Sequence, residues 1–175
     1  TSTVTATVDG SSVTSVGTAS DTLTVSAFER LQFTKSFIDD PAAPGGTVTA
    51  RYTLTNPNAG QAATDIAFTD QISVPNGLTA NTLPAAGSCG AGSTFSVFVD
   101  TDELFLDVAD GQLAVSDSCT FDVILNVASD VAPGSYPSTT GDVTYTLAAT
   151  TGITSGASDT LTVQGGANLS FSKSF

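Results

Sequence analysis

Two stretches of this chain occur twice at the same spacing, and this repeat constrains the fold more than any other feature. The heptapeptide ASDTLTV at 19–25 recurs unchanged at 157–163, a shift of 138 residues. LQFTKSF at 31–37 recurs at the same shift as LSFSKSF at 169–175. Two separate blocks at one spacing indicate an internal repeat, and a fixed period of this kind is typical of tandem arrays.

The period predicts where one repeat unit begins and ends. A complete unit is expected over 31–168, with the linker QGGAN at its C-terminal end. Residues 1–30 are then the last two strands of a preceding unit plus the linker SAFER at 26–30, and 169–175 are the first strand of a following unit. Because an isolated hairpin is only marginally stable in water, both flanks are expected to find partners outside the unit.

Alternation of apolar and polar residues predicts strands throughout the unit. It is clearest in CTFDVILNV at 119–127, and TVTARYTLT and ATDIAFTD alternate in the same way. Turn-forming residues separate these runs, and APGSYP at 132–137 is assigned to a turn. Seven to nine short antiparallel strands predict an all-β, immunoglobulin-like β-sandwich. The predicted strands are 47–55, 63–70, 93–99, 103–108 and 119–127, with 143–147 and 161–163 as a closing hairpin.

The charge of the chain excludes several classes of function. It has 17 acidic residues, 4 Lys plus Arg and no His, for a formal net charge of −13. Nucleic acid and anionic lipid are poor partners, because phosphate contacts need basic side chains. Without His, the chain cannot build a Ser-His-Asp triad, a Cys-His pair or a histidine metal site. No catalytic constellation and no membrane-spanning run is found, so we expect neither an enzyme, a cofactor nor a membrane span.

Cys89 and Cys119 are the two cysteines of the chain. A reactive or metal-bound pair is one interpretation, and a disulfide in an extracellular protein is the preferred one. By loop-closure entropy, a bond across 30 residues would stabilise the fold by about 3 to 4 kcal/mol. We expect it to hold the long connection at 70–92 to the sandwich.

Three segments of the unit resemble a known family. PGGTVTARYTLTN, ATDIAFTD and APGSYPSTTGDVTYTL follow one another in the order found in the Ig-like "conserved repeat domain" of bacterial surface proteins. The resemblance covers 31–163 and implies a secreted, tandemly repeated stalk, adhesin or filament protein without a catalytic site. The chain departs from the family where GTYTNT would be expected, because it reads GSYPST and lacks an Asn near Ser138.

Lys35 lies on the apolar face of its predicted strand, together with Leu31, Phe33 and Phe37. The preferred prediction is an ion pair at the rim of the sandwich, with the lysine stem packed on phenylalanine. A second alternative places this face against a neighbouring domain. The third is an intramolecular isopeptide bond, known in related surface domains, because a desolvated lysine becomes nucleophilic. The candidate partners with core-facing parity are Asn56, Asp70 and Asp159.

Two acidic loops could hold calcium weakly through carboxylate oxygens. The alternative is that their aspartates cap turns, as Asp before Pro does. A formal glycosylation sequon, NLS, also occurs at 168–170. The candidate calcium ligands are Asp39, Asp40, Asp100, Asp102 and Glu103.

The repeat and the resemblance together predict a structural unit of an extracellular filament, fibre or stalk at the cell surface. Copies would join head to tail through 1–25 and 169–175, because one open repeated contact generates a rod or helix. The competing prediction is an adhesin module that recognises a glycan or another surface partner.

Overall fold

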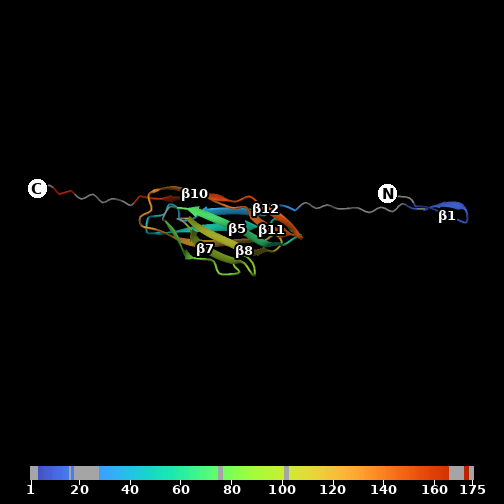
Figure 1. The fold of residues 1–175 in the computed structure, drawn as a ribbon, viewed down its shortest axis with the longest axis horizontal. Helices are drawn as coiled ribbons and strands as arrows, with labels where there is room; N and C mark the ends of the chain where they lie inside the picture. Colours follow the sequence, from blue (N-terminus) through green and yellow to red (C-terminus); the bar gives the residue numbers. More distant parts are fainter. Residues whose placement is uncertain are drawn as a thin grey trace.

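The computed structural model describes residues 4–15, 17, 28–74, 77–100, 103–165 and 172–173. These residues form strands, turns and loops without a helix, which confirms the all-β prediction (Figure 1). The strands are β1 (Thr5–Val8), β2 (Ser11–Thr14), β3 (Gln32–Phe37), β4 (Thr47–Thr55), β5 (Ala63–Ser73), β6 (Leu78–Thr82), β7 (Thr94–Asp100), β8 (Glu103–Leu113), β9 (Ser118–Val127), β10 (Gly134–Thr140), β11 (Val143–Leu147), β12 (Thr150–Thr154) and β13 (Ser158–Val163).

Strands β3 to β13 form the predicted β-sandwich of two antiparallel sheets. The first sheet has the order β3-β4-β9-β6. In the second, β5 pairs with β8 on one side, and β8 pairs in turn with β7. On its other side β5 pairs with β10 and β11, which are followed by β13 and β12. In two-layer packing of this kind, one face of a strand is turned toward the opposite sheet.

Two long strands of the second sheet are each interrupted once. β10 and β11 both pair antiparallel with β5, through Thr140 with Asp70 and Thr144 with Ala67. They are therefore two halves of one strand that is broken at 141–142. β13 and β12 follow them in the same way, β13 beside β10 and β12 beside β11.

This interruption corrects three predictions. The unit contains eleven described strands rather than seven to nine. APGSYP is not a turn, because β10 begins at Gly134 and runs through Pro137. The closing hairpin joins β11 to β12, whereas 158–163 pairs with β10. Apolar periodicity could not find β10, since its two buried residues are the polar Ser138 and Thr140.

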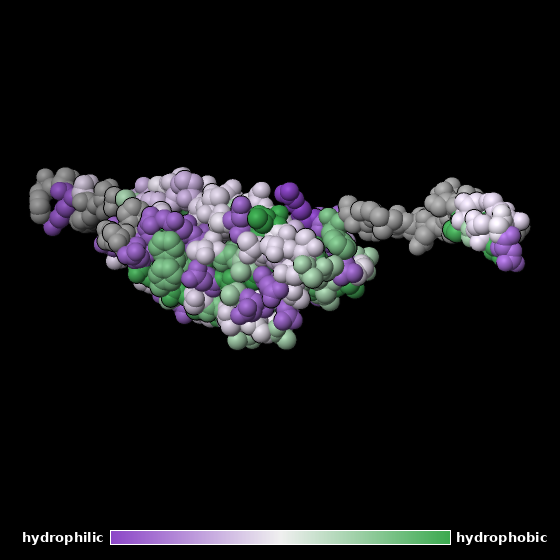
Figure 2. Space-filling view, turned by 45° about the vertical axis from the view of Figure 1, so that its right-hand side comes forward, coloured by the Kyte–Doolittle hydropathy of each residue, from purple (hydrophilic) through white to green (hydrophobic). Residues whose placement is uncertain are grey.

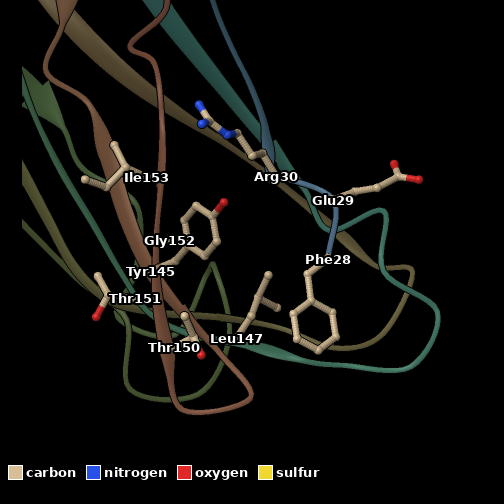
Figure 3. Close-up of a pocket in the computed structure, with 9 residues that line it drawn as sticks. All are labelled: Phe28, Glu29, Arg30, Tyr145, Leu147, Thr150, Thr151, Gly152 and Ile153. Atoms are coloured by element: carbon tan, nitrogen blue, oxygen red, sulfur yellow. The ribbon is translucent and has the colours of Figure 1, made fainter. Parts of the chain in front are cut away.

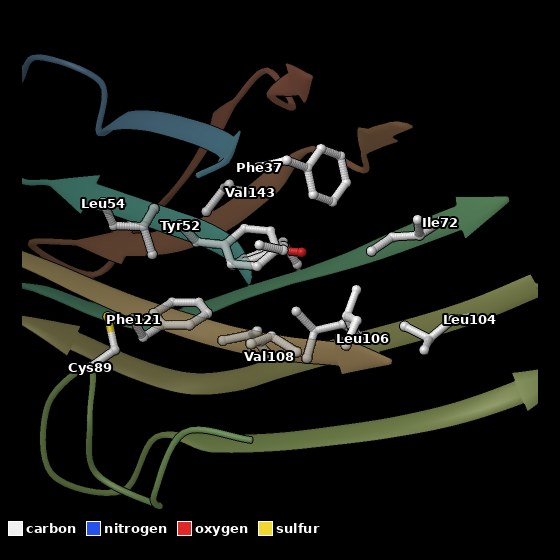
Figure 4. Packing of buried hydrophobic residues seen from close by; sticks show 14 of the residues in the cluster. Phe37, Tyr52, Leu54, Ile72, Cys89, Leu104, Leu106, Val108, Phe121 and Val143 are labelled. Carbon is white, nitrogen blue, oxygen red and sulfur yellow. The ribbon is translucent and has the colours of Figure 1, made fainter. Parts of the chain in front are cut away.

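The core between the sheets is built from the alternating residues that the sequence indicated. On β9, Phe121, Val123, Leu125 and Val127 are buried. Figure 4 shows Phe121 and Tyr52 among the aliphatic side chains of both sheets. The two rings lie 5.2 Å apart between centroids, a stacking distance typical of aromatic pairs in cores.

The hairpin β1–β2 is separate from this core. Within the described part of the chain its strands pair only with each other, and all of their residues are exposed. The repeated block at 19–25 lies outside the described residues, as does the predicted strand 169–175 apart from Ser172 and Lys173.

Polar and apolar side chains are interspersed over the surface that Figure 2 shows. Among the described residues, no helix has the length and apolar character needed to cross a membrane.

Candidate functional site

Lys35 lies at the centre of a polar cluster between the two sheets. Its side chain is fully enclosed, and its Nζ lies 2.6 Å from Asp70 Oδ2. Nζ also donates a hydrogen bond to Ser138 Oγ at 2.5 Å. The Tyr52 hydroxyl donates to Asp70 Oδ2 at 2.5 Å, and the Ser138 hydroxyl lies 3.3 Å from Asp70 Oδ1. We call Lys35, Tyr52, Asp70 and Ser138 the lysine cluster.

Strand register explains why these four side chains meet. Lys35 is the cross-strand partner of Tyr52 in β3 and β4. Asp70 shares the inward face of β5 with Ile66 and Phe68, and Ser138 points inward from the neighbouring β10. The cluster therefore ties the first strand of the sandwich to both sheets. Among the described residues, every buried side-chain nitrogen and oxygen has a hydrogen-bond partner.

Burial perturbs the titration of this cluster. Desolvation lowers the pKa of Lys35, and the nearby Asp70 carboxylate opposes that shift. Burial raises the pKa of Tyr52 well above its ordinary value, and the charge of Asp70 and the hydrogen bond to it add to the shift. The ammonium also lies 5.1 Å from the centroid of the Phe37 ring, a cation–π distance.

The structure separates the three predicted partners of Lys35. Asp70 contacts it directly. Asp159 lies close enough for its charge to raise the pKa of Lys35, but its Oδ2 accepts the N–H of Phe37 at 2.7 Å. Asn56 belongs to a different cluster, because its amide donates to the carbonyls of Gln61 and Ala114. The alternative of an interface lysine does not fit a side chain that is enclosed within the sandwich.

The surroundings of Asp70 bear on the isopeptide hypothesis. Amide formation joins Nζ to Cγ of Asp70 with loss of water, and a neighbouring acid must give the carboxyl a proton. In the described part of the chain, Asp70 receives its hydrogen bonds from Lys35, Tyr52 and Ser138, none of which is a carboxylic acid. Ser138 occupies the position where the family resemblance implied Asn. The geometry suits an ion pair.

The predicted disulfide joins Cys89 to Cys119, with 5.3 Å between the Cα atoms. Cys119 lies on β9, and Cys89 is buried in the loop between β6 and β7. The Cys89 carbonyl also accepts the N–H of Gln112 at 2.8 Å. Gly90 is required beside it, since a Cβ there would collide with the Gln112 backbone. The disulfide therefore attaches this loop to β9, and the hydrogen bond from Gln112 attaches it to β8.

The acidic loops do not converge on a metal site in the described part of the chain. No three His, Cys, Asp or Glu side chains come together there. Asp40 Oδ1 accepts the N–H of Thr162 at 2.6 Å, and Glu103 accepts from Gln71 and Ser73. Asp102 lies outside the described residues.

Residues 28–30 are held at the entrance of the sandwich by an asparagine that the sequence did not single out. The N–H of Glu29 donates to Asn58 Oδ1 at 2.9 Å, and Asn58 Nδ2 donates back to the Glu29 carbonyl at 2.8 Å. Asn58 in turn donates to Asn56 Oδ1. Beside this bracket lies a hollow of about 450 Å³, lined by Phe28, Tyr145, Leu147 and Ile153 among others (Figure 3).

One family matches most of the chain. Residues 32–163 match the family described as "Domain of unknown function (DUF7933)". The chain belongs to this family. The matched span runs from β3 to the end of β13. The family description names neither an activity nor a surface repeat, and a search of curated proteins found no match.

Solved cohesin domains are similar to this member of the family in fold. One is a type I cohesin from a cohesin–dockerin complex of Clostridium thermocellum, with a TM-score of 0.56 and 17% identity over 78% of this chain and 100% of that one. Another is the cohesin module of a family 33 glycoside hydrolase of Clostridium perfringens, with a TM-score of 0.54 and 10% identity over 76% and 96%. At these identities the likeness concerns the β-sandwich alone.

Proposed function

We propose that this chain contains one structural repeat unit of an extracellular bacterial array, a filament, fibre or stalk whose units are joined end to end. The unit would bear load and set spacing rather than catalyse a reaction. The observation that carries the proposal is the hairpin β1–β2. It has the strand register of β11–β12, but it forms a separate two-stranded sheet.

The hairpin β1–β2 has the register of β11–β12. Both turns contain two consecutive residues with positive φ, Asp9 and Gly10 in one and Ala148 and Ala149 in the other. A two-residue turn of this kind matches the twist of a hairpin. Each cross-strand pair of β1–β2 has a counterpart 139 residues later: Thr5–Thr14, Ala6–Val13, Thr7–Ser12 and Val8–Ser11 correspond to Thr144–Ile153, Tyr145–Gly152, Thr146–Thr151 and Leu147–Thr150.

The two hairpins differ in what covers them. Val143, Tyr145 and Leu147 of β11 are buried against the rest of the sandwich. Their counterparts Val4 and Val8 are 69% and 57% exposed. Leaving such side chains in water forgoes about 1.5–3 kcal/mol each, which burial in a core would recover.

At one cross-strand pair, the larger side chain lies on the first strand in one hairpin and on the second strand in the other. The Tyr145 ring lies over Gly152, where a Cβ would collide with it. In β1–β2 the small residue is Ala6 and the large one is Val13, on the opposite strand. The same inward site is thus filled from either strand, as expected if both hairpins close the same kind of core. The partner that would cover β1–β2 is therefore the β5 strand and facing sheet of a preceding repeat.

Other features support an extracellular array. A disulfide is typical of oxidising compartments outside the cytosol. The Asn58 bracket fixes where the linker enters the unit, which limits swinging between consecutive units.

The test is a two-repeat protein in which residues 31–139 precede the full chain, so that Thr1 takes the place of Thr140 and 1–30 can complete the leading unit. Backbone amides of 4–14 should exchange slowly with deuterium in the two-repeat protein and rapidly in the single chain. Val8→Asp should unfold the leading unit only, whereas Thr7→Asp, on the opposite face of β1, should be tolerated. Equal, rapid exchange of 4–14 in both proteins would refute the proposal.

A protein- or glycan-binding module is the second candidate, and one surface favours it. On the edge strand β7, Phe98 is 49% exposed and stacks on Phe105 of β8 with 4.9 Å between ring centroids. Exposed aromatic pairs are typical of recognition surfaces. If this candidate is right, Phe98→Ala should abolish binding to a ligand found on a glycan array while leaving the fold intact.

A further inference from the structure

We propose that the first and last segments of the unit form a tension-bearing seam that is loaded in shear when the chain is pulled from its two ends. The seam consists of residues 31–42 and 154–164.

Hydrogen bonds join the two segments at intervals along their length. The Thr154 hydroxyl donates to the Leu31 carbonyl at 2.7 Å. Further along, the N–H of Phe37 donates to Asp159 Oδ2 at 2.7 Å, and Asp40 Oδ1 accepts from Thr162.

The last contacts are made by the backbone alone. The N–H of Ala42 donates to the Thr162 carbonyl, and the N–H of Gln164 donates to the Ala42 carbonyl, both at 2.9 Å. Ala42 and Val163 form a parallel bridge. Because the partners advance together, from 31 with 154 to 42 with 164, the two segments run parallel.

The parallel direction decides how the contacts are stressed. The chain enters the sandwich before Leu31 at one end of its long axis and leaves after Gln164 at the other (Figure 1). Tension therefore pulls two parallel segments past each other along their length. All of the seam's hydrogen bonds must then yield together, whereas a pull from one end would break them one after another.

The lysine cluster reinforces the same segment. For β3 to slip, the Lys35 ammonium must leave Asp70 and Ser138, which come from β5 and β10. Separating a buried ion pair leaves two uncompensated charges, so this step opposes sliding strongly. The lysine thereby anchors the strand that receives the load, and the repeated block LSFSKSF carries a lysine at the same position.

Only the source of the tension rests on the proposed function. The seam itself is a property of the single unit. The prediction about unfolding force and the prediction about hydrogen exchange of residues 4–14 can therefore be refuted separately.

Single-molecule force spectroscopy tests the seam in two pulling directions. Handles attached through azide-bearing residues at 29 and 164 load it in shear, and handles at 29 and 155 peel it from one end. All three positions have exposed side chains. The unfolding force should be higher for 29/164 than for 29/155 at the same loading rate. Equal forces, or a higher force for 29/155, would overturn the proposal.

Variants separate the seam from general stability. Asp40→Ala with Asp159→Ala should lower the 29/164 force and reduce the ratio between the two directions. Ile72→Val removes a methyl group from the core away from the seam, and should lower both forces in proportion. Asp130→Ala, an exposed acid outside the seam, should change neither. If the seam variant reduces the ratio no more than Ile72→Val does, the seam does not bear the load.

Discussion

At the scale of single residues, the lysine cluster balances the cost of enclosing a charge. A buried ammonium loses its hydration, and Asp70 compensates for it at 2.6 Å while Tyr52 and Ser138 satisfy the remaining oxygens. The net stabilisation by such a pair is small, but the cost of removing one partner is large.

A mutant cycle measures this asymmetry. Asp70→Leu should reduce the free energy of unfolding by about 3–5 kcal/mol, because it leaves the Lys35 charge buried and unpaired. The double variant Lys35→Met/Asp70→Leu should lose less than the sum of the two single variants. Urea unfolding gives all four values, and additive losses would contradict the ion pair.

Intact mass tests the covalent alternative. We expect the full chain to have its unmodified mass apart from the disulfide. Loss of one water molecule, absent from Lys35→Arg, would instead show an amide between Lys35 and Asp70.

The buried tyrosine predicts sensitivity to alkali. The pKa of Tyr52 is raised in the folded state, so its contribution to stability is present below the ordinary value of 10.0 and is lost as pH rises above it. The pKa of Lys35 is lowered, so its contribution rises with pH up to its ordinary value of 10.5. Above pH 10.5, Tyr52 is the one of these two residues whose contribution to stability still changes with pH. Urea unfolding at several pH values above 10.5 should show that the free energy of unfolding falls with pH, and that it falls less in Tyr52→Phe. An equal fall in the two proteins would contradict the raised pKa of Tyr52.

At the scale of strands and loops, the disulfide compensates for sparse secondary structure. Among the described residues, the loop between β6 and β7 has no strand pairing to either sheet, and its cysteine is bonded to the central strand β9.

Removing the disulfide should cost about 3 to 4 kcal/mol by the loop-closure entropy of 30 residues. Cys89→Ala/Cys119→Ala and the reduced wild-type chain should unfold at similar urea concentrations, both below the oxidised chain. Unfolding of the oxidised and reduced chains at the same urea concentration would show that the loop is held by other contacts.

At the scale of the whole molecule, a net charge of −13 on 175 residues acts against compactness. Raising NaCl from about 0.01 to about 0.15 M shortens the Debye length from about 30 to about 8 Å and should increase the free energy of unfolding. CaCl₂ at equal ionic strength should have the same effect if screening is the cause. A larger effect of calcium would point to ion binding in the acidic loops, and a fall in stability with NaCl would contradict self-repulsion.

The sequence by itself determined the all-β class, the inward faces of β4, β5 and β9, and the internal period, because side-chain alternation and self-similarity are local properties. It also identified Cys89 and Cys119 as the candidate disulfide pair, because the chain has two cysteines. It placed Lys35 and Asp70 on inward faces without deciding that they meet, since parity says nothing about which inward residues face one another across two sheets.

Only the tertiary structure decided the rest. Ser138 and Thr140 are polar residues on an inward face, so the strand that carries them had no apolar signal. Asn56 has the parity of a core residue, but it does not pair with Lys35. It accepts hydrogen bonds from Asn58, which in turn holds Glu29 where the chain enters the sandwich. Asp40 has the composition of a calcium ligand, yet it accepts a backbone N–H from Thr162. These assignments depend on contacts between segments more than one hundred residues apart in several cases, and such contacts arise only when the two sheets close on each other.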